Sequence, residues 1–199
     1  MDERDARLAL ELATDPDLDA VADLLNLAYR GPEGWTTEAG YMDGDRITAA
    51  ALRAECAAQP GARLLLLKAA GQIDACVQLE PAGEGVWRLG LLTVRPDLQA
   101  GGVGRRLLQA AESEAAARGA ERIRLTVVNV RSELIGWYER RGYRRSGAEE
   151  PYPYDELPYG APRRGDLCFL VLEKPLRRAG SGANDGTRTR DLRRDRPAL

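Results

Sequence analysis

The stretch RPDLQAGGVGRRLL, residues 95–108, decides the fold of this chain. Three glycines, Gly101, Gly102 and Gly104, stand directly ahead of a run with apolar residues at helical spacing. Glycine costs backbone entropy and adds no side chain to a core, so its use here needs another reason. The first N–H groups of a helix have no partner inside it, and the helix dipole adds positive charge. A glycine turn lets an anion reach these groups, which predicts a phosphate cradle, with Arg105 adding a full charge. A helix-entry loop without a ligand is the alternative interpretation.

Two other glycine-rich phosphate motifs do not fit this stretch. No Lys-Ser or Lys-Thr pair follows the glycines, which excludes the phosphate loop of nucleotide hydrolases. The dinucleotide fingerprint needs G-x-G-x-x-G after an early strand of a parallel sheet, and that spacing is absent.

The periodicity around the stretch predicts one mixed sheet. Helices are expected over residues 17–30, 49–58, from the glycine loop to about residue 118, and over 133–141. Strands are expected over residues 8–13, 63–70, 73–80, 86–94, 122–130, 143–148 and 166–174. Strands in hairpin succession followed by β-α-β predict an α/β (α+β) fold with a mostly antiparallel sheet of about six to seven strands, flanked by helices.

The composition indicates one globular domain with a tail. The chain has 199 residues, of which 44% are hydrophobic and 30% charged, and we place the domain at residues 1–175. Residues 176–199 are rich in Gly, Arg, Asp and Thr and predict a disordered basic tail. The segment GTRTRD, residues 186–191, can be encoded by DNA whose complement is typical of the T-arm of transfer RNA genes. We therefore hypothesise that the tail results from read-through into such a gene on the opposite strand.

Several classes of site are excluded by residue content. The chain has no histidine, which removes His-based triads and the usual zinc sites, and we expect no metal. Three unpaired cysteines favour reduced thiols in the cytoplasm. No apolar run reaches the ~18 residues of a membrane span, and the acidic N-terminus is unlike a signal peptide.

The charge is unevenly distributed along the chain. Residues 100–145 hold ten arginines and five acidic residues, whereas the whole chain has a net charge of -2. A basic centre in a mildly acidic protein indicates either a local anionic partner or a solvated helix face. The pI of about 5.5 argues against a nucleic-acid partner.

Two motifs together resemble a known family. The segment 99–104, QAGGVG, fits the Q/R-x-x-G-x-G/A acyl-coenzyme A motif of the GCN5-related N-acetyltransferase superfamily. The segment 137–143, WYERRGY, resembles the aromatic-Tyr-Glu-x-x-Gly-aromatic segment of that superfamily. Asn129 falls where the family often has an asparagine, and the order of elements over about residues 5–175 also matches.

The resemblance implies acetyl-CoA as cosubstrate and a role for each matching position. Backbone of Leu92, Thr93 and Val94 would pair with the pantetheine amides as an added strand does. The N–H groups of the cradle loop would hold the pyrophosphate; this loop comprises Gln99, Ala100, Gly101, Gly102, Val103 and Gly104. Arg105 would reach a phosphate, and Asn129 would bind the pantetheine arm. Tyr138 would lie near the thioester sulfur and protonate the departing thiolate, although packing beside Trp137 is the alternative.

Two long irregular segments, residues 31–47 and 149–166, are the candidates for the acceptor site. Their aromatic and acidic residues suit a cationic amine, while surface decoration is the alternative. The residues expected to bind the acceptor are Trp35, Thr36, Glu38, Tyr41, Tyr152 and Tyr154. Either Glu80 or Glu38 would act as the general base, directly or through water.

These observations predict an N-acetyltransferase that acts by direct attack of an amine of a small molecule or peptide on acetyl-CoA, in a ternary complex. The main chain near Val94 would stabilise the oxyanion. A different acyl donor, an O-acceptor, a non-catalytic acyl-CoA sensor and a nucleic-acid binder are the competing hypotheses. We expect a monomer or homodimer without membrane contact.

Overall fold

A seven-stranded sheet with the order β1-β3-β4-β5-β6-β9-β7 forms the centre of the fold. The computed structural model describes residues 8–155 and 160–176. The sheet strands are β1 (Glu11–Leu12), β3 (Arg63–Ala69), β4 (Gln72–Pro81), β5 (Val86–Val94), β6 (Arg122–Val128), β7 (Arg144–Pro151) and β9 (Cys168–Pro175). The helices are α1 (Leu18–Arg30), α2 (Ala49–Ala58), α3 (Val103–Ala117) and α4 (Ser132–Glu139), with 3-10 turns η2 (Asp15–Asp17) and η3 (Pro96–Gly101). The predicted mixed α/β sheet flanked by helices is confirmed.

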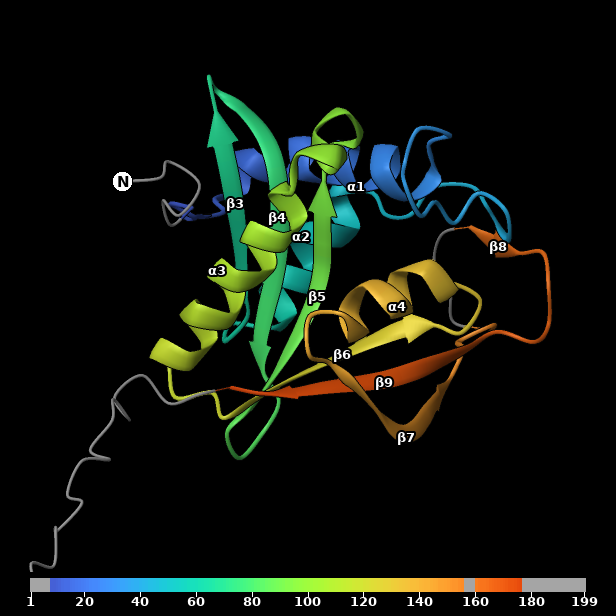
Figure 1. Ribbon diagram of the computed structural model, residues 1–199. Coiled ribbons are helices and arrows are strands. Elements are labelled where there is room, and N and C mark those ends of the chain that lie inside the picture. The colour runs from blue at the N-terminus through green and yellow to red at the C-terminus, as the bar shows by residue number, and fades with distance from the viewer. Residues whose placement is uncertain (1–7, 156–159, 177–199) are drawn as a thin grey trace, which may run out of the picture.

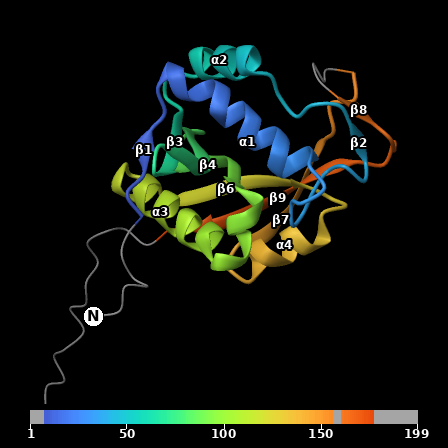
Figure 2. The same cartoon turned by 90° about the horizontal axis from the view of Figure 1, so that it is seen from above.

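The helices cover the sheet in two layers. Helices α1 and α2 lie on one face and α3 and α4 on the other, as the view from above shows (Figure 2). Strand β3 shows why the sheet is buried on both sides: Leu64 and Leu66 pack with α1 and α2, whereas Leu65 belongs to the core under α3. Successive residues of a strand point to opposite faces of the sheet, so the continuous leucine run of β3 contributes side chains to the hydrophobic cores on both faces.

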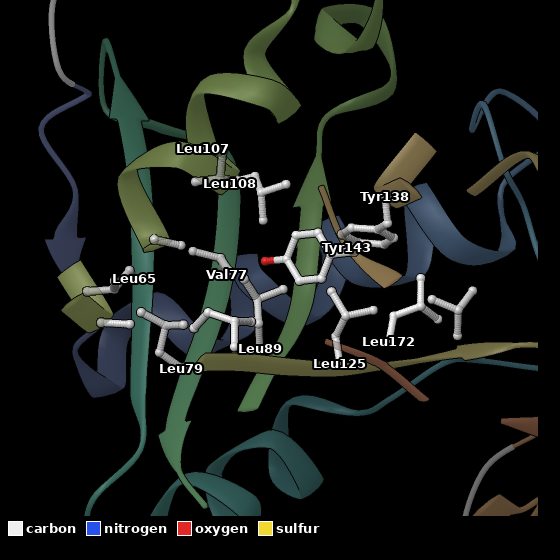
Figure 3. Close-up of a cluster of buried hydrophobic side chains, with 14 of the residues drawn as sticks. Leu65, Val77, Leu79, Leu89, Leu107, Leu108, Leu125, Tyr138, Tyr143 and Leu172 are labelled. Carbon is white, nitrogen blue, oxygen red and sulfur yellow. The ribbon is translucent and has the colours of Figure 1, made fainter. Parts of the chain in front are cut away.

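A polar network crosses the core under α3. Tyr143 is 1% exposed, and its hydroxyl donates to a carboxylate oxygen of Glu112 at 3.0 Å. The ammonium of Lys174 contacts the same carboxylate at 2.7 and 2.8 Å. Figure 3 shows Tyr143 lying beside Tyr138 among the buried leucines of the sheet and α3. Buried polar groups need hydrogen-bond partners, and these three side chains supply partners to each other. The network therefore links α3, β9 and the segment after α4.

Strands β5 and β6 begin as neighbours and then separate. They form a parallel pair only from Val86↔Arg122 to Arg88↔Arg124, and Figure 1 shows them diverging beyond that point. Every other pairing in the sheet is antiparallel. Beyond this point no strand pairing joins β5 to β6, so each of the two strands has an open edge toward the other.

A β-bulge in β5 lies at the separation. The register between β4 and β5 shifts between Cys76 and Gln78, and Leu91 has φ +48°, in the left-handed region. The carbonyl oxygen of Leu91 accepts from the hydroxyl of Thr93 at 3.1 Å and from the thiol of Cys76 at 3.5 Å. Burial raises the pKa of Cys76 to about 12, so this thiol stays protonated as a donor. These contacts stabilise the bulge, which bends β5 away from β6.

The two long segments expected to be irregular pair with each other. Strand β2 (Met42–Asp43) is antiparallel to β8 (Ala161–Pro162), and we call this two-stranded sheet the clasp. Arg163 pairs with Asp43 across it. Gly160 has φ +76°, and a Cβ there would lie 2.5 Å from the carbonyl oxygen of Asp43, so only glycine allows this approach.

Other elements differ from expectation in extent. The first strand shrinks to Glu11–Leu12, while the short strand expected at residues 143–148 runs to Pro151. The predicted tail beyond residue 176 lies outside the described residues. Among the helices that the structure describes, none is long and apolar enough to span a membrane. Within the same described ranges, no group of three or more His, Cys, Asp or Glu side chains could hold a metal ion.

Candidate active site

A cavity of about 590 Å³ opens where β5 and β6 separate. It continues from the start of α3, along the separated strands, past α4 to the segment after α1. Its lining includes twelve of the predicted site residues: Trp35, Thr36, Glu38, Leu92, Thr93, Val94, Gln99, Ala100, Gly102, Gly104, Arg105 and Tyr138. The structure thus brings the expected donor segment and the first of the two expected acceptor segments, residues 31–47, to one cavity.

The cradle loop at one end of the cavity offers unused backbone donors. The first bond from the N-terminus of α3 to the preceding loop joins the N–H of Arg106 to the carbonyl of Gly102 at 3.2 Å. Among the described residues, the N–H groups from Gly102 to Arg105 have no acceptor. Gly102 has φ +73°, and a Cβ there would meet no atom within 4 Å. The loop therefore has the left-handed turn and the open space that an anion at a helix N-terminus needs.

Two arginines add charge at the same end. The guanidinium of Arg141 lies 3.7 Å from the ring centroid of Trp137 and donates to the carbonyl of that residue at 2.7 Å. Burial and the neighbouring charges of Arg140 and Arg105 lower the pKa of Arg141. In the part of the chain that the structure describes, no carboxylate pairs with Arg105 or Arg141. Like charges held together without a counter-ion favour binding of an anion.

Gln99 connects the cradle loop with the acceptor side. Its side-chain N–H donates to the carbonyl oxygen of Val94 at 2.9 Å. Its side-chain oxygen accepts from the backbone N–H of Trp35 at 2.8 Å. One carboxamide therefore fixes the end of β5, the cradle loop and residue 35 relative to each other.

Tyr138 reaches the middle of the cavity from α4. Its ring lies 4.9 Å from that of Trp137 and 5.4 Å from that of Tyr143, both edge-on. The residue is 6% exposed, and its hydroxyl has no hydrogen-bond partner among the described residues. Burial, together with the nearby Tyr29, raises the pKa of Tyr138 above the usual phenol value. The packing fixes the ring while the neutral hydroxyl remains available as a proton donor.

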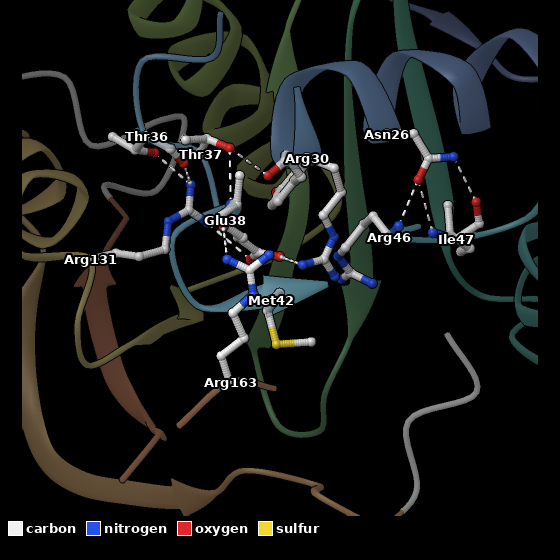
Figure 4. A network of polar contacts seen from close by, with 12 residues as sticks. Asn26, Arg30, Thr36, Thr37, Glu38, Met42, Arg46, Ile47, Arg131 and Arg163 are labelled. Carbon is white, nitrogen blue, oxygen red and sulfur yellow. Dashed lines mark hydrogen bonds and ion pairs between the residues drawn. The ribbon is translucent and has the colours of Figure 1, made fainter. Parts of the chain in front are cut away.

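Glu38 lies at the other end of the cavity between two arginines. It is 7% exposed, and its two carboxylate oxygens lie 3.4 Å from Arg30 and from Arg131 (Figure 4). Arg131 also donates to the backbone and side-chain oxygens of Thr36, both at 2.5 Å. The carboxylate of Glu38 balances the charge of the two guanidiniums on either side of it. Its position favours charge neutralisation over the predicted role as general base.

We expect Glu38→Gln to destabilise the fold by about 3 kcal/mol, because it leaves two buried guanidiniums without their counter-ion. Urea unfolding followed by circular dichroism measures the change. Glu33→Gln is the matched control, since Glu33 is exposed in the same segment, and should shift stability by no more than ~0.5 kcal/mol. Equal stability of the two variants would contradict the importance of the ion pairs.

Three predicted acceptor residues lie elsewhere. Tyr41, Tyr152 and Tyr154 pack with Met42 and Phe169 in a hydrophobic cluster, and of these five residues only Phe169 lines the cavity. The hydroxyl of Tyr154 accepts from the N–H of Leu167 at 2.7 Å, and that of Tyr152 contacts the sulfur of Met42 at 3.2 Å. These rings form the core of the clasp beside the cavity, and their role in binding the acceptor stays a prediction.

Four further predicted residues also lie outside the lining. The amide of Asn129 donates to the carbonyl of Asp166 at 2.9 Å and accepts from the N–H of Cys168 at 3.3 Å, so it joins β6 to β9 and does not face the cavity. Glu80 pairs with Arg88 at 2.9 Å, which argues against a base. Val103, the first residue of α3, is buried in the core, and Gly101 is exposed.

Several lining residues were not among the predicted site residues. Tyr29, Arg46, Arg131, Trp137 and Arg141 line the cavity. Trp137 and Arg141 belong to the WYERRGY segment, where their spacing around Tyr138 is a usable signal. Arg131 precedes α4 as its N-cap residue, and its reach across to Thr36 depends on contacts between residues 95 apart.

The comparisons with known proteins agree with this geometry. The model of the acetyltransferase (GNAT) family matches residues 18–143. An IAA acetyltransferase of Azospirillum brasilense is 29% identical over 120 residues, which is 60% of this chain and 71% of that protein.

Solved structures share the fold. The ribosomal-protein-alanine N-acetyltransferase of Brucella melitensis has a TM-score of 0.63 at 19% identity and covers 85% of this chain and 100% of its own. A GNAT family acetyltransferase of Elizabethkingia anophelis with acetyl-CoA bound has a TM-score of 0.61 at 18% identity and covers 86% and 99%.

Proposed function

The chain belongs to the acetyltransferase (GNAT) family, and we propose on this basis that it is an N-acetyltransferase that moves the acetyl group of acetyl-CoA to an amine. One observation carries the proposal. A single cavity joins a loop of unpaired N–H groups, the separated edges of β5 and β6, and the hydroxyl of Tyr138. The loop, the strand edges and the Tyr138 hydroxyl correspond in turn to the phosphate, the pantetheine arm and the thioester of one extended cosubstrate.

The cradle loop fits the pyrophosphate. Its donors from Gly102 to Arg105 are free among the described residues, and Arg105 and Arg141 supply full charges beside them. The separated edge of β5, at Leu92 to Val94, accommodates the amides of the pantetheine arm in the way that a sheet edge accepts an added strand. The acetyl group then lies beside Tyr138.

The reaction needs no covalent enzyme intermediate. A neutral amine attacks the thioester carbonyl, a new C–N bond forms, and the C–S bond breaks. A main-chain N–H near Val94 stabilises the oxyanion, and Tyr138 gives its proton to the departing thiolate, which has a pKa of about 8.5 when free. The amine loses its proton to solvent and Tyr138 regains one from solvent, so the protons balance and the enzyme returns to its starting state.

The proposal is tested by incubating the purified protein with acetyl-CoA and a broad panel of amines. We expect acetyl-CoA-dependent release of free thiol with at least one amine, and an acetylated amine of the matching mass. Acetyl-CoA binding without thiol release for any amine would instead support a sensor. The control is the same panel with acetyl-CoA and without the protein.

A further inference from the structure

Positive charge exceeds negative charge at the acceptor end of the cavity. Arg46 and Arg131 line this end, and Arg30 lies behind Glu38. Of the carboxylates that line the cavity, Glu38 is at this end and is already shared by Arg30 and Arg131, whereas Glu55 is exposed on α2. Three guanidiniums thus face one carboxylate, which leaves a local surplus of positive charge.

Arg46 is the open member of this group. Its guanidinium lies 5.6 Å from the ring centroid of Tyr29, and that of Arg131 lies 5.3 Å from the same centroid. Within the described ranges, no carboxylate pairs with Arg46. The two guanidiniums therefore flank one aromatic ring in the cavity wall.

The backbone of Arg46 is fixed in place. The side-chain oxygen of Asn26 accepts from the N–H groups of Arg46 at 2.6 Å and Ile47 at 3.2 Å, while its amide donates to the carbonyl of Ile47 at 2.8 Å (Figure 4). A cation on a fixed backbone loses little entropy when a ligand binds, so this geometry favours recognition.

Unsatisfied donors accompany the charge surplus. The Nε atoms of Arg131 and Arg30 are buried and have no hydrogen-bond acceptor among the residues described. A buried donor without a partner is destabilising, and more so when it is charged. This environment is suited to an additional anion and opposes a second cation.

We propose, resting on the proposed acetyl transfer, that the acceptor is an amine that carries a carboxylate, of the α-amino acid class, with its carboxylate on the guanidinium of Arg46. One open guanidinium matches the single charge and planar pair of oxygens of a carboxylate. Arg46 and Tyr138 line the same cavity, so a carboxylate held at Arg46 keeps the amine of the acceptor in the cavity that contains Tyr138. This replaces the cationic acceptor that the sequence predicted.

The test compares α-amino acids with their own carboxamides at saturating acetyl-CoA, using alanine, methionine, phenylalanine and glutamate, with spermidine as a polycation. Initial rates are followed by thiol release. We expect kcat/KM to be ~10–100-fold higher for the acid than for the amide of at least one amino acid, the range for a hydrogen-bonded charge. The amine of the carboxamide is less basic, so a larger fraction of it is neutral and able to attack at a given pH. This effect alone would favour the amide over the acid.

Two variants separate recognition from general effects. Arg46→Gln should bring the acid-to-amide ratio close to one. Arg144→Gln removes an exposed arginine of β7 that is not part of the cavity lining and should keep the ratio of the unmodified protein.

The failure of this inference is distinguishable from failure of the proposed function. If acetyl-CoA binds and amides or spermidine are acetylated as efficiently as acids, the acidic acceptor is wrong while acetyl transfer stands. If acetyl-CoA gives no calorimetric binding signal, both are wrong. An unchanged acid preference in Arg46→Gln would also overturn the assignment of the carboxylate site.

Discussion

Gly102→Glu is expected to abolish acetyl-CoA binding. The new side chain would project into the open space of the cradle loop, where a Cβ meets no atom within 4 Å. Its carboxylate would occupy the free N–H groups and repel the pyrophosphate of the cosubstrate. At a ligand concentration of 100 times Kd, the unmodified protein should gain about 2.7 kcal/mol of stability, and the variant should gain none.

Backbone strain has to be separated from this effect. Gly102 has φ +73°, so any side chain there costs about 1–2 kcal/mol of folding stability. Gly119, at the other end of α3, has φ +88° and equally open surroundings. Gly119→Glu should therefore lose similar stability while keeping the full shift with acetyl-CoA. Thermal unfolding with and without acetyl-CoA measures both, and equal ligand shifts in the two variants would contradict the cradle.

Tyr138→Phe is expected to lower kcat by roughly 10²–10⁴-fold with little change in the Kd of acetyl-CoA, as for loss of a general acid. The phenylalanine keeps the edge-on contacts with Trp137 and Tyr143 and removes only the hydroxyl. Because burial raises the pKa of Tyr138, the hydroxyl stays protonated around neutral and mildly alkaline pH, and its ionisation should not limit the rate there. Single-turnover kinetics at saturating acetyl-CoA report the chemical step directly.

Tyr143→Phe is the matched control for this result. It removes a buried hydroxyl from the same segment, but that hydroxyl donates to Glu112 in the core and not into the cavity. We expect a loss of about 1 kcal/mol of stability and an unchanged kcat. A similar fall in kcat for both variants would mean that Tyr138 acts only through packing.

The sequence by itself determined the elements and the donor side of the site. Leucines at strand and helix spacing set which residues are buried, because that information is local. The glycines of the cradle loop predicted a tight turn ahead of α3, and Gly102 makes it in the left-handed conformation. The WYERRGY segment placed Tyr138 on a helix beside its aromatic neighbours, since their spacing follows the helical repeat.

The tertiary structure alone decided the acceptor side. Whether Glu38 is a free base or a shared counter-ion depends on Arg131, which is 93 residues away, and no local pattern encodes that contact. The clasp pairs β2 with β8 and takes Tyr41, Tyr152 and Tyr154 into its own core, although the sequence shows only two polar segments with tyrosines. Asn129 likewise joins β6 to β9. The physical reason is that a charged or amphipathic side chain takes its role from the partners that folding brings to it, whereas apolar spacing and glycine conformation act within a few residues.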